Sequence, residues 1–332
     1  MNILVTGGSG YIGSALVEYL LKQNHKIRVF ETQIFGNPIA HLASNRCEFI
    51  EGDIRDLKAI TRATKGIQTV IHLAGVVTDE LVDMNPDFGH QVNVGGTENV
   101  VRACTTNSVP RIVYASSSSI YGEAAEGKTP PTEWITPKPK TIYAKQKLEG
   151  EEIVLEYGTR DGSRFATAVR QATAMGPAPR MRLDTVVNIF SKQAYFDKLI
   201  TPYGGSQFRS NVFIHDVARF YEMLATIDGW RINNRVWNLT DGNMMVKEIA
   251  HRVHDAAKDR DIDVKVEIQD IEDSRSYRLD GTKVTQDLSF STSVGIYGAA
   301  MRNFDYFKKS KLDPTDDIYY NNRRMADVVK GV

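Results

Sequence analysis

Tyr143 and Lys147 stand four residues apart in a segment that we expect to be helical from residue 143 to about residue 156. Residues with this spacing lie on one face of a helix, so the phenol and the ammonium group would be neighbours. A cation beside a phenol favours the phenolate and moves its pKa of about 10 toward neutrality. Such a tyrosine can exchange a proton while an alcohol and a carbonyl interconvert. The pattern alone is common by chance, and a helical tyrosine is often a core residue.

A second candidate site is the glycine-rich turn at the start of the chain. An apolar strand at residues 2–6 runs directly into Gly7, Gly10 and Gly13, and a helical pattern begins at once. In dinucleotide-binding turns one glycine makes the tight turn, another lets backbone N–H groups approach a pyrophosphate, and the last lets helix and strand pack closely. The helix N-terminus then faces the anion. The sequence therefore predicts a dinucleotide site here.

Two acidic residues stand where the rest of a dinucleotide would lie. Glu31 ends the second predicted strand, about 20 residues past the glycines, where a carboxylate can accept both ribose hydroxyls. It would repel a 2′-phosphate, so the sequence favours NAD over NADP. Asp53 follows a third strand, where we expect the adenine half, although a turn role would also explain it. A solvated glutamate at a strand end is the alternative for Glu31.

Strands and helices alternate through the first half of the chain, which positions these residues. Further strands are expected at residues 47–50, 68–75, 111–116 and 165–170, with a long helix at about 86–107. This order predicts an α/β fold with a doubly wound parallel sheet and helices on both faces. Ala74 and Gly75 lie at a carboxyl strand end, where ligands bind in such sheets. His72, in mid-strand, is expected in the core.

Composition and charge narrow the class of protein. The 332 residues suit one large or two unequal domains, and Lys plus Arg (41) equals Asp plus Glu (41). No basic field for nucleic acid and no polybasic membrane patch is expected. Cys47 and Cys104 have no metal-binding spacing and suggest a reducing compartment. Without an apolar run of spanning length or a signal-peptide pattern, we expect a cytoplasmic protein.

The motifs together resemble a known family. The glycine turn, Glu31 and Asp53 precede His72-Leu-Ala-Gly75, Asn93-Val-Gly-Gly-Thr97, Ser116 to Gly122 and the Tyr143/Lys147 pair. In this order they resemble the extended short-chain dehydrogenases, specifically the nucleotide-sugar epimerase/dehydratase family, over nearly the whole chain. The resemblance implies a Rossmann domain for NAD at 1–170 plus roughly 211–240, and a smaller α/β substrate domain at 171–210 and 241–332. It also implies a homodimer through the helices at about 86–107 and 143–157.

The resemblance assigns roles to individual residues. Ser117 would hydrogen-bond the reacting sugar oxygen, Tyr143 would take or give its proton, and Lys147 would hold the nicotinamide ribose and tune the tyrosine. The implied cofactor contacts lie at the glycine turn, at the strand ends and on two helices: Gly7, Gly10, Tyr11, Ile12, Gly13, Glu31, Asp53, Ile54, Leu73, Ala74, Gly75, Asn93, Tyr143 and Lys147.

The implied substrate is a nucleotide-diphosphate sugar. Its expected contacts come mostly from the second half of the chain: Ser118, Thr173, Asn188, Arg209 and Arg275. Thr173 stands where the family usually has asparagine, which shortens the hydrogen-bonding group. The two arginines would clamp the diphosphate, because a guanidinium fork suits bidentate phosphate contact. A surface ion pair is the alternative for Arg209. Residues 179–182 add two further cations in a loop.

The residues after Ser117 bear on the reaction. Family members that eliminate water typically have an Asp-Glu pair or a Glu at the positions of Ser118 and Ser119, and decarboxylases tend to have Glu at the second of them. A serine cannot act as a carboxylate base near neutral pH. Asp79 or Glu80 could supply one instead. The leading hypothesis is a 4-epimerase that works through a 4-keto sugar and tightly bound NAD. A reductase or dehydrogenase with exchangeable NAD is the runner-up. A dehydratase and a non-catalytic NAD-binding regulator are less favoured.

Overall fold

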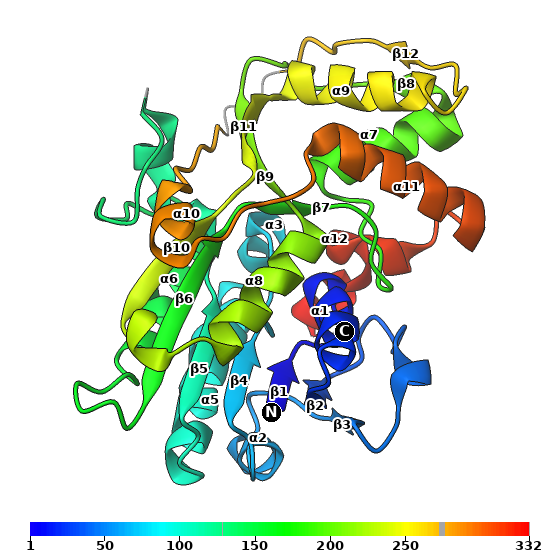
Figure 1. Cartoon of the computed structure of the whole chain (residues 1–332). Helices are drawn as coiled ribbons and strands as arrows, with labels where there is room; N and C mark the ends of the chain where they lie inside the picture. Colours follow the sequence, from blue (N-terminus) through cyan, green and yellow to red (C-terminus); the bar gives the residue numbers. More distant parts are fainter. Residues whose placement is uncertain (128, 272–275, 332) are drawn as a thin grey trace.

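The computed structural model describes residues 1–127, 129–271 and 276–331, so Arg275 lies outside the described residues. Seven parallel strands form the main sheet in the order β10-β6-β5-β4-β1-β2-β3 (Figure 1). These strands are β1 (Asn2–Thr6), β2 (Lys26–Glu31), β3 (Cys47–Glu51), β4 (Thr69–His72), β5 (Arg111–Ala115), β6 (Phe165–Gln171) and β10 (Arg235–Leu239). The predicted doubly wound parallel sheet is confirmed, and its order reverses direction beside β1.

Helices cover both faces of this sheet. On one face α1 (Tyr11–Lys22) and α8 (Ile214–Thr226) pack their apolar sides on the strands, and Leu16 and Leu20 are fully buried there. On the other face lie α2 (Leu57–Ala63), α5 (Gly96–Thr106) and α6 (Ile142–Leu155). The predicted long helix is a continuous run of α4 (Pro86–His90), a π-helical turn η2 (Gln91–Gly95) and α5.

A second, smaller core forms above the carboxyl ends of the main strands. Its sheet contains β7 (Thr173–Met175), β9 (Phe208–Phe213) and β11 (Gly242–Met245), and β8 (Leu199–Ile200) pairs with β12 (Lys265–Val266). The helices α7 (Val186–Lys192), α9 (Val246–Lys258) and α11 (Ile296–Ser310) pack together beside them. In the β12–β8 pair Lys265 lies opposite Leu199, and β10 returns to the main sheet beside β6.

The remaining helical segments are short. They are η1 (Ala40–Leu42), α3 (Asp79–Met84), η3 (Ser118–Glu126), η4 (Gln193–Asp197), η5 (Gly229–Arg231) and α10 (Thr282–Leu288). Within the described ranges, no helix has both the length and the apolar character needed to cross a bilayer.

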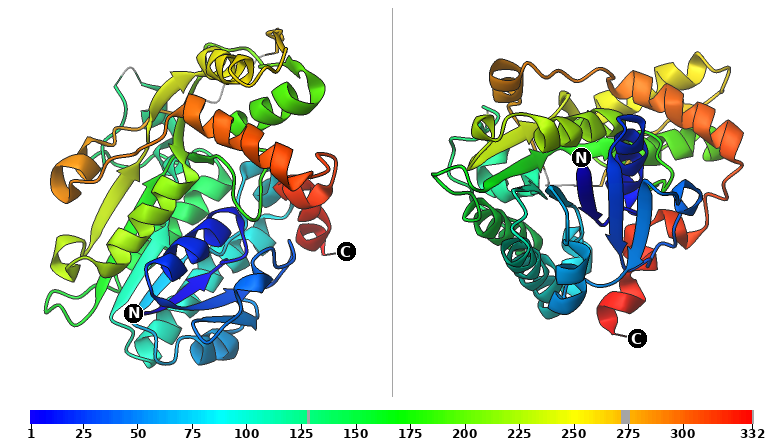
Figure 2. Two further views of the ribbon diagram at one scale, coloured as in Figure 1. Left: turned by 45° about the vertical axis from the view of Figure 1, so that its right-hand side comes forward. Right: turned by 60° about the horizontal axis from the view of Figure 1, so that its bottom comes forward.

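The C-terminal strap, residues 317–331, returns from the smaller core to the main sheet. It consists of η6 (Asp317–Tyr319), α12 (Asn321–Arg324) and α13 (Ala326–Lys330), drawn in red beside the blue N-terminal strands in Figure 2. Thr78 donates a hydrogen bond to Asn322 (2.9 Å), and Asn85 donates one to the Val329 carbonyl (2.9 Å). The C-terminal tail therefore wraps back onto the segment that follows β4.

Candidate active site

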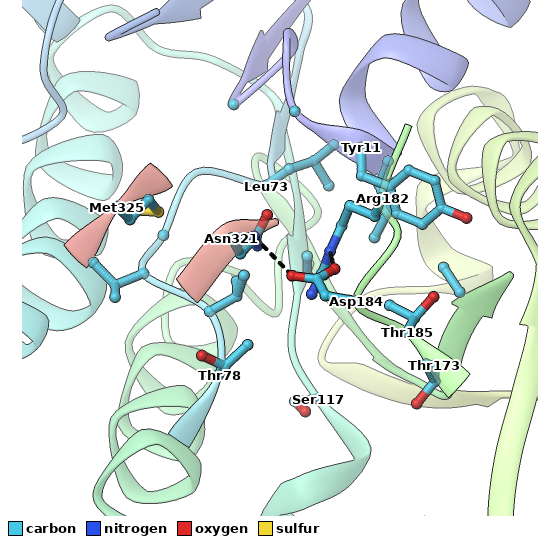
Figure 3. Close-up of a pocket in the computed structure, with 18 of the residues that line it drawn as sticks. Tyr11, Leu73, Thr78, Ser117, Thr173, Arg182, Asp184, Thr185, Asn321 and Met325 are labelled. Carbon is cyan, nitrogen blue, oxygen red and sulfur yellow. Dashed lines mark hydrogen bonds and ion pairs between the residues drawn. The ribbon is translucent and has the colours of Figure 1, made fainter. Parts of the chain in front are cut away.

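A cavity of about 900 Å³ lies where the main strands end and the smaller core begins. Most residues singled out in the sequence line it together, although they come from distant parts of the chain: Gly7, Gly10, Tyr11, Ile12, Gly13, Glu31, Asp53, Ile54, Leu73, Ala74, Gly75, Ser117, Ser118, Tyr143, Lys147, Thr173 and Arg209. Figure 3 shows Tyr11, Ser117 and Thr173 around this space.

The glycine turn fits a dinucleotide pyrophosphate. Gly7 has a φ of +73°, and a Cβ there would stand 2.8 Å from the backbone nitrogen of Ala74. A Cβ at Gly13 would overlap the carbonyl oxygen of Gly7. Gly10 precedes α1 and has no side chain that could cap the helix. The first backbone N–H groups of α1 are therefore left without a side-chain cap, and the residues that carry them line the cavity. This uncapped helix start between glycines is the arrangement that phosphate groups favour.

Glu31 lies at the edge of the same cavity. Its carboxylate accepts hydrogen bonds from the Thr32 N–H (2.9 Å) and from the Ser9 N–H in the glycine turn (3.4 Å). Burial raises the pKa of this carboxyl group. Glu31 therefore stands where the sequence expects a ribose contact.

Asp53 lies on the wall but has a partner of its own. The Arg55 guanidinium makes an ion pair with it at 2.7 Å and stacks over the Phe88 ring, with 4.8 Å between guanidinium carbon and ring centroid. Both Arg55 and Phe88 line the cavity, and the sequence analysis singled out neither. An adenine contact by Asp53 stays a prediction.

Ser117, Tyr143 and Lys147 face the cavity together, which confirms that Tyr143 and Lys147 share one face of α6. The Ser117 hydroxyl hydrogen-bonds the Ser119 hydroxyl (2.8 Å) and accepts the Ser119 N–H (3.2 Å). The Ser117 side chain also acts on Tyr143, where it lowers the pKa of the phenol. The Lys147 ammonium lies over the ring of Tyr114, 4.2 Å from its centroid.

The lowered phenol pKa expected for Tyr143 stays a prediction for the NAD-bound protein, because burial dominates in the ligand-free cavity. Burial raises the pKa of Tyr143 to about 12 and lowers the pKa of Lys147 to about 7. The sequence spacing predicts that the two side chains are neighbours but says nothing about the loss of water around them, which is the larger effect here. Arg182 is the cation that counteracts burial at Tyr143, whereas the negative charge of Asp79 adds to it.

The cofactor contact expected of Asn93 stays a prediction, because in the ligand-free protein its side chain is bonded within the fold. Its side chain is 2% exposed and does not line the cavity. The side-chain oxygen accepts the Val76 N–H (2.8 Å), and the amide group donates to the Val76 carbonyl (3.0 Å) and to Gln146 (3.0 Å). Asn93 therefore shapes the turn that follows β4.

The substrate contact expected of Asn188 likewise stays a prediction, and in this structure the residue bonds to its neighbours. Its side chain is fully buried behind the cavity wall, with its oxygen accepting the Gly176 N–H (3.0 Å). Its amide group donates to the Tyr11 hydroxyl (3.0 Å) and to the Arg182 carbonyl (2.9 Å). Through these bonds Asn188 positions two residues that do line the cavity.

The substrate side of the cavity is formed by the smaller core. Thr173 in β7 and Arg209 in β9 both line it. Arg209 donates to the Phe208 carbonyl (3.0 Å), and its guanidinium carbon is 5.7 Å from the Tyr277 ring centroid. The second predicted clamp, Arg275, falls outside the described residues.

A group of residues to which the sequence assigns no role closes the cavity, and it includes the two cations of the 179–182 loop. Asp184 accepts hydrogen bonds from the Arg182 side chain (2.7 Å) and from the Asn321 N–H in the strap (2.7 Å), as Figure 3 shows. Arg180 and the strap residue Met325 also line the cavity. The alternation of charges at 180, 182 and 184 is a signal in the sequence, but no pattern marks the strap.

Two further residues bear on the chemistry. Ser118 lines the cavity, whereas Ser119 does not. Asp79 lines it near Tyr143, and its Oδ1 has no hydrogen-bond partner in the described part of the chain. The carboxylate beside Tyr143 therefore comes from the first residue of α3 and not from the positions after Ser117.

Comparisons with known proteins agree with this geometry. The uncharacterized protein y4nG of Sinorhizobium fredii is 38% identical over 173 residues, which are 52% of this chain and 41% of that relative. A putative UDP-glucose 4-epimerase of Methanocaldococcus jannaschii is 28% identical over 255 residues, which are 76% of this chain and 82% of that relative. The chain matches three of its curated relatives over only 34% to 49% of their own length.

Solved structures and a family model complete the comparison. The crystal structure of the Thermus thermophilus UDP-glucose 4-epimerase in complex with NAD has a TM-score of 0.79 at 25% identity, covering 93% of this chain and 100% of that one. The model of the NAD dependent epimerase/dehydratase family matches residues 3–239, which include the glycine turn, the catalytic candidates and β10. This chain belongs to the NAD-dependent epimerase/dehydratase family.

Proposed function

We propose that this protein is an NAD-dependent epimerase that inverts C4 of a nucleotide-diphosphate hexose through a 4-keto intermediate. The observation that carries the proposal is the placement of Ser117, Tyr143 and Lys147 on one cavity wall with the glycine turn. The epimerase-named relatives from M. jannaschii and T. thermophilus support it.

The residues divide the chemistry as follows. NAD supplies the hydride acceptor and donor when it is bound. Tyr143 takes the proton of the 4-hydroxyl group and later returns it, and Ser117 shares that hydrogen bond. Arg209 binds the diphosphate of the sugar nucleotide, and Thr173 contacts the sugar.

The ligand-free pKa of Tyr143 constrains this mechanism. At about 12 it makes the phenol a weak base near neutral pH, so proton abstraction needs a positive charge nearby. Arg182 supplies part of that charge, and a protonated Lys147 would add to it. Because Lys147 titrates near 7, its charge depends on what fills the cavity.

Two other reactions are compatible with the same residues. A reductase or dehydrogenase with exchangeable NAD would use the same residues. A dehydratase is favoured by one observation, the Asp79 carboxylate on the wall, whose Oδ1 has no hydrogen-bond partner among the described residues and which could act as the acid or base in an elimination. We also propose a homodimer through α5 and α6, as in the family resemblance.

The test is a panel of nucleotide-diphosphate hexoses incubated with the pure protein, without added NAD, and followed by proton NMR at C1 and C4. Inversion at C4 supports the epimerase. Turnover that needs added NAD indicates a reductase or dehydrogenase, and loss of the C6 hydroxyl indicates a dehydratase. The Asp79→Asn variant separates the last case, since elimination should then stop while simple inversion continues.

A further inference from the structure

Arg180 is a buried cation whose partners are all neutral. Its side chain is 4% exposed, and its guanidinium carbon lies 3.8 Å from the centroid of the Phe35 ring. Nη2 donates hydrogen bonds to the Asn321 side-chain oxygen (2.7 Å) and to the Ile318 carbonyl (3.3 Å). Nε has no hydrogen-bond partner among the described residues. The guanidinium group therefore keeps donor capacity at the cavity wall.

A buried positive charge without a counter-charge is costly. Burial lowers the pKa of Arg180 to about 9, and Asp184 and Glu31 only partly offset this through their negative charges. An anionic ligand in the cavity would offset the remaining free-energy cost of burying the guanidinium charge, and it would accept a hydrogen bond from Nε.

The position of Arg180 indicates which part of a ligand it would meet. Its backbone N–H donates to the Ser14 hydroxyl (3.1 Å), and the Ser14 N–H closes the first turn of α1 on the Gly10 carbonyl (2.9 Å). The arginine therefore lies beside the uncapped start of a 12-residue helix. A helix N-terminus and an unpaired guanidinium nitrogen both favour a phosphate group.

The C-terminal strap holds this arginine and covers the cavity. Asn321 binds the Arg180 guanidinium through its side chain, and Met325 and Val328 line the cavity. Met325 and Val329 are buried in an apolar cluster with residues that follow β4, namely Val76, Leu81 and Val82. The strap is thus held by Asn321 before, and by Val329 after, the residues that cover the cavity.

We propose that Arg180, held by Asn321, binds a phosphate of the NAD pyrophosphate, and that the strap thereby retains the dinucleotide between turnovers. The proposed Arg180–phosphate contact requires only that the protein binds NAD, so it applies equally to an epimerase and to a reductase. Its failure can therefore be told apart from failure of the proposed reaction.

A diphosphate could also come from the sugar nucleotide, which offers the same chemistry. The contact between Arg180 and Ser14, in the first turn of α1, favours the cofactor. The test must therefore measure both ligands on the same variants, with NAD and UDP as the two probes.

The experiment measures NAD and UDP affinity by titration calorimetry, and exchange of bound NAD for fluorescent etheno-NAD, on the full-length protein. In Arg180→Met, NAD affinity should fall about tenfold or more, as for loss of a charge-assisted hydrogen bond, while UDP affinity changes less than about twofold. The matched control is Arg323→Met, on the same strap, where the exposed Arg323 pairs with Asp317 (3.5 Å). It should leave both affinities unchanged.

A second variant keeps the test valid if Arg180→Met does not fold. Asn321→Asp gives Arg180 a protein counter-ion that competes with phosphate, so the protein should be at least as heat-stable as wild type yet exchange NAD about fivefold faster or more. Wild-type NAD affinity in both folded variants would overturn the proposal. A loss of UDP affinity with NAD affinity intact would overturn the assignment to the cofactor.

Discussion

The ammonium group of Lys147 lies 4.2 Å from the centroid of the Tyr114 ring, in a contact that takes it out of water. The sequence pattern places this lysine beside Tyr143 and suggests a lasting positive charge there. Burial instead lowers the pKa of Lys147 to about 7 in the ligand-free protein. The positive charge that Lys147 can offer to the neighbouring Tyr143 is therefore conditional on pH and on what occupies the cavity.

Lys147→Met should stabilise the NAD-free protein in a pH-dependent way. The pKa of Lys147 is about 7 in the folded protein and near 10.5 in the unfolded chain, so between these values the unfolded chain binds more protons. The stability of the wild type therefore rises with pH across this window. Below pH 7 the destabilisation caused by the buried charge of Lys147 has its full size. The melting temperature of Lys147→Met should exceed that of wild type by several degrees at pH 6.5 and by much less at pH 9.5.

The control for this prediction is Lys145→Met on the same helix. Lys145 is exposed, so its removal should leave the melting temperature nearly unchanged at both pH values. A Lys147→Met effect of equal size at pH 6.5 and 9.5 would show that the lysine is not held with a lowered pKa.

Tyr143→Phe should lower kcat by a factor of about 10² to 10⁴, the usual loss when a general acid–base group is removed. The phenylalanine keeps the ring in its place, so the protein should fold and still purify with NAD. Single-turnover and steady-state rates on the active sugar nucleotide measure the effect. A rate within twofold of wild type would remove Tyr143 from the mechanism.

Asn93→Ala should destabilise the fold more than it alters ligand affinity. Removing the amide leaves the buried Val76 N–H without its 2.8 Å partner, which costs about 1–3 kcal/mol of unfolding free energy. Urea unfolding monitored by circular dichroism measures this. If unfolding is unchanged but NAD affinity drops sharply, Asn93 contacts the cofactor after all.

The sequence predicted what depends on short-range pattern. The structure matches two local features of the sequence. One is the succession of strand, glycine turn and helix at residues 2–22, and the other is the spacing of Tyr143 and Lys147. The parallel direction of the strands followed from the alternation of strands and helices. The division into two domains at the predicted boundaries stays a prediction.

The sequence could not predict what depends on long-range packing. The pKa values of Tyr143 and Lys147 follow from burial by elements far away in the chain. Asn93 and Asn188 fit a motif position, but other buried groups take up their hydrogen bonds. The strap has no periodic pattern, because Asn321 and Met325 acquire their role only by folding back onto residues that precede them by more than a hundred positions.

Glu31→Lys should weaken NAD binding by about tenfold or more, because it replaces a hydrogen-bond acceptor for the ribose with a cation. The NADP affinity should fall less or rise. Glu51→Lys is the matched control, since Glu51 pairs in register with Glu31 on the next strand but does not line the cavity. Equal NAD affinity in wild type and Glu31→Lys would show that the cofactor assignment to this carboxylate is wrong.

The central claim is that Tyr143 and retained NAD move a hydride away from C4 and back to it. It is tested most directly by incubating UDP-hexose deuterated at C4 with the purified protein in ordinary water, without added NAD. The account predicts that both C4 epimers appear and that each keeps its deuterium at C4. Exchange of the label with water, its transfer to free NAD, or the absence of the second epimer would contradict it.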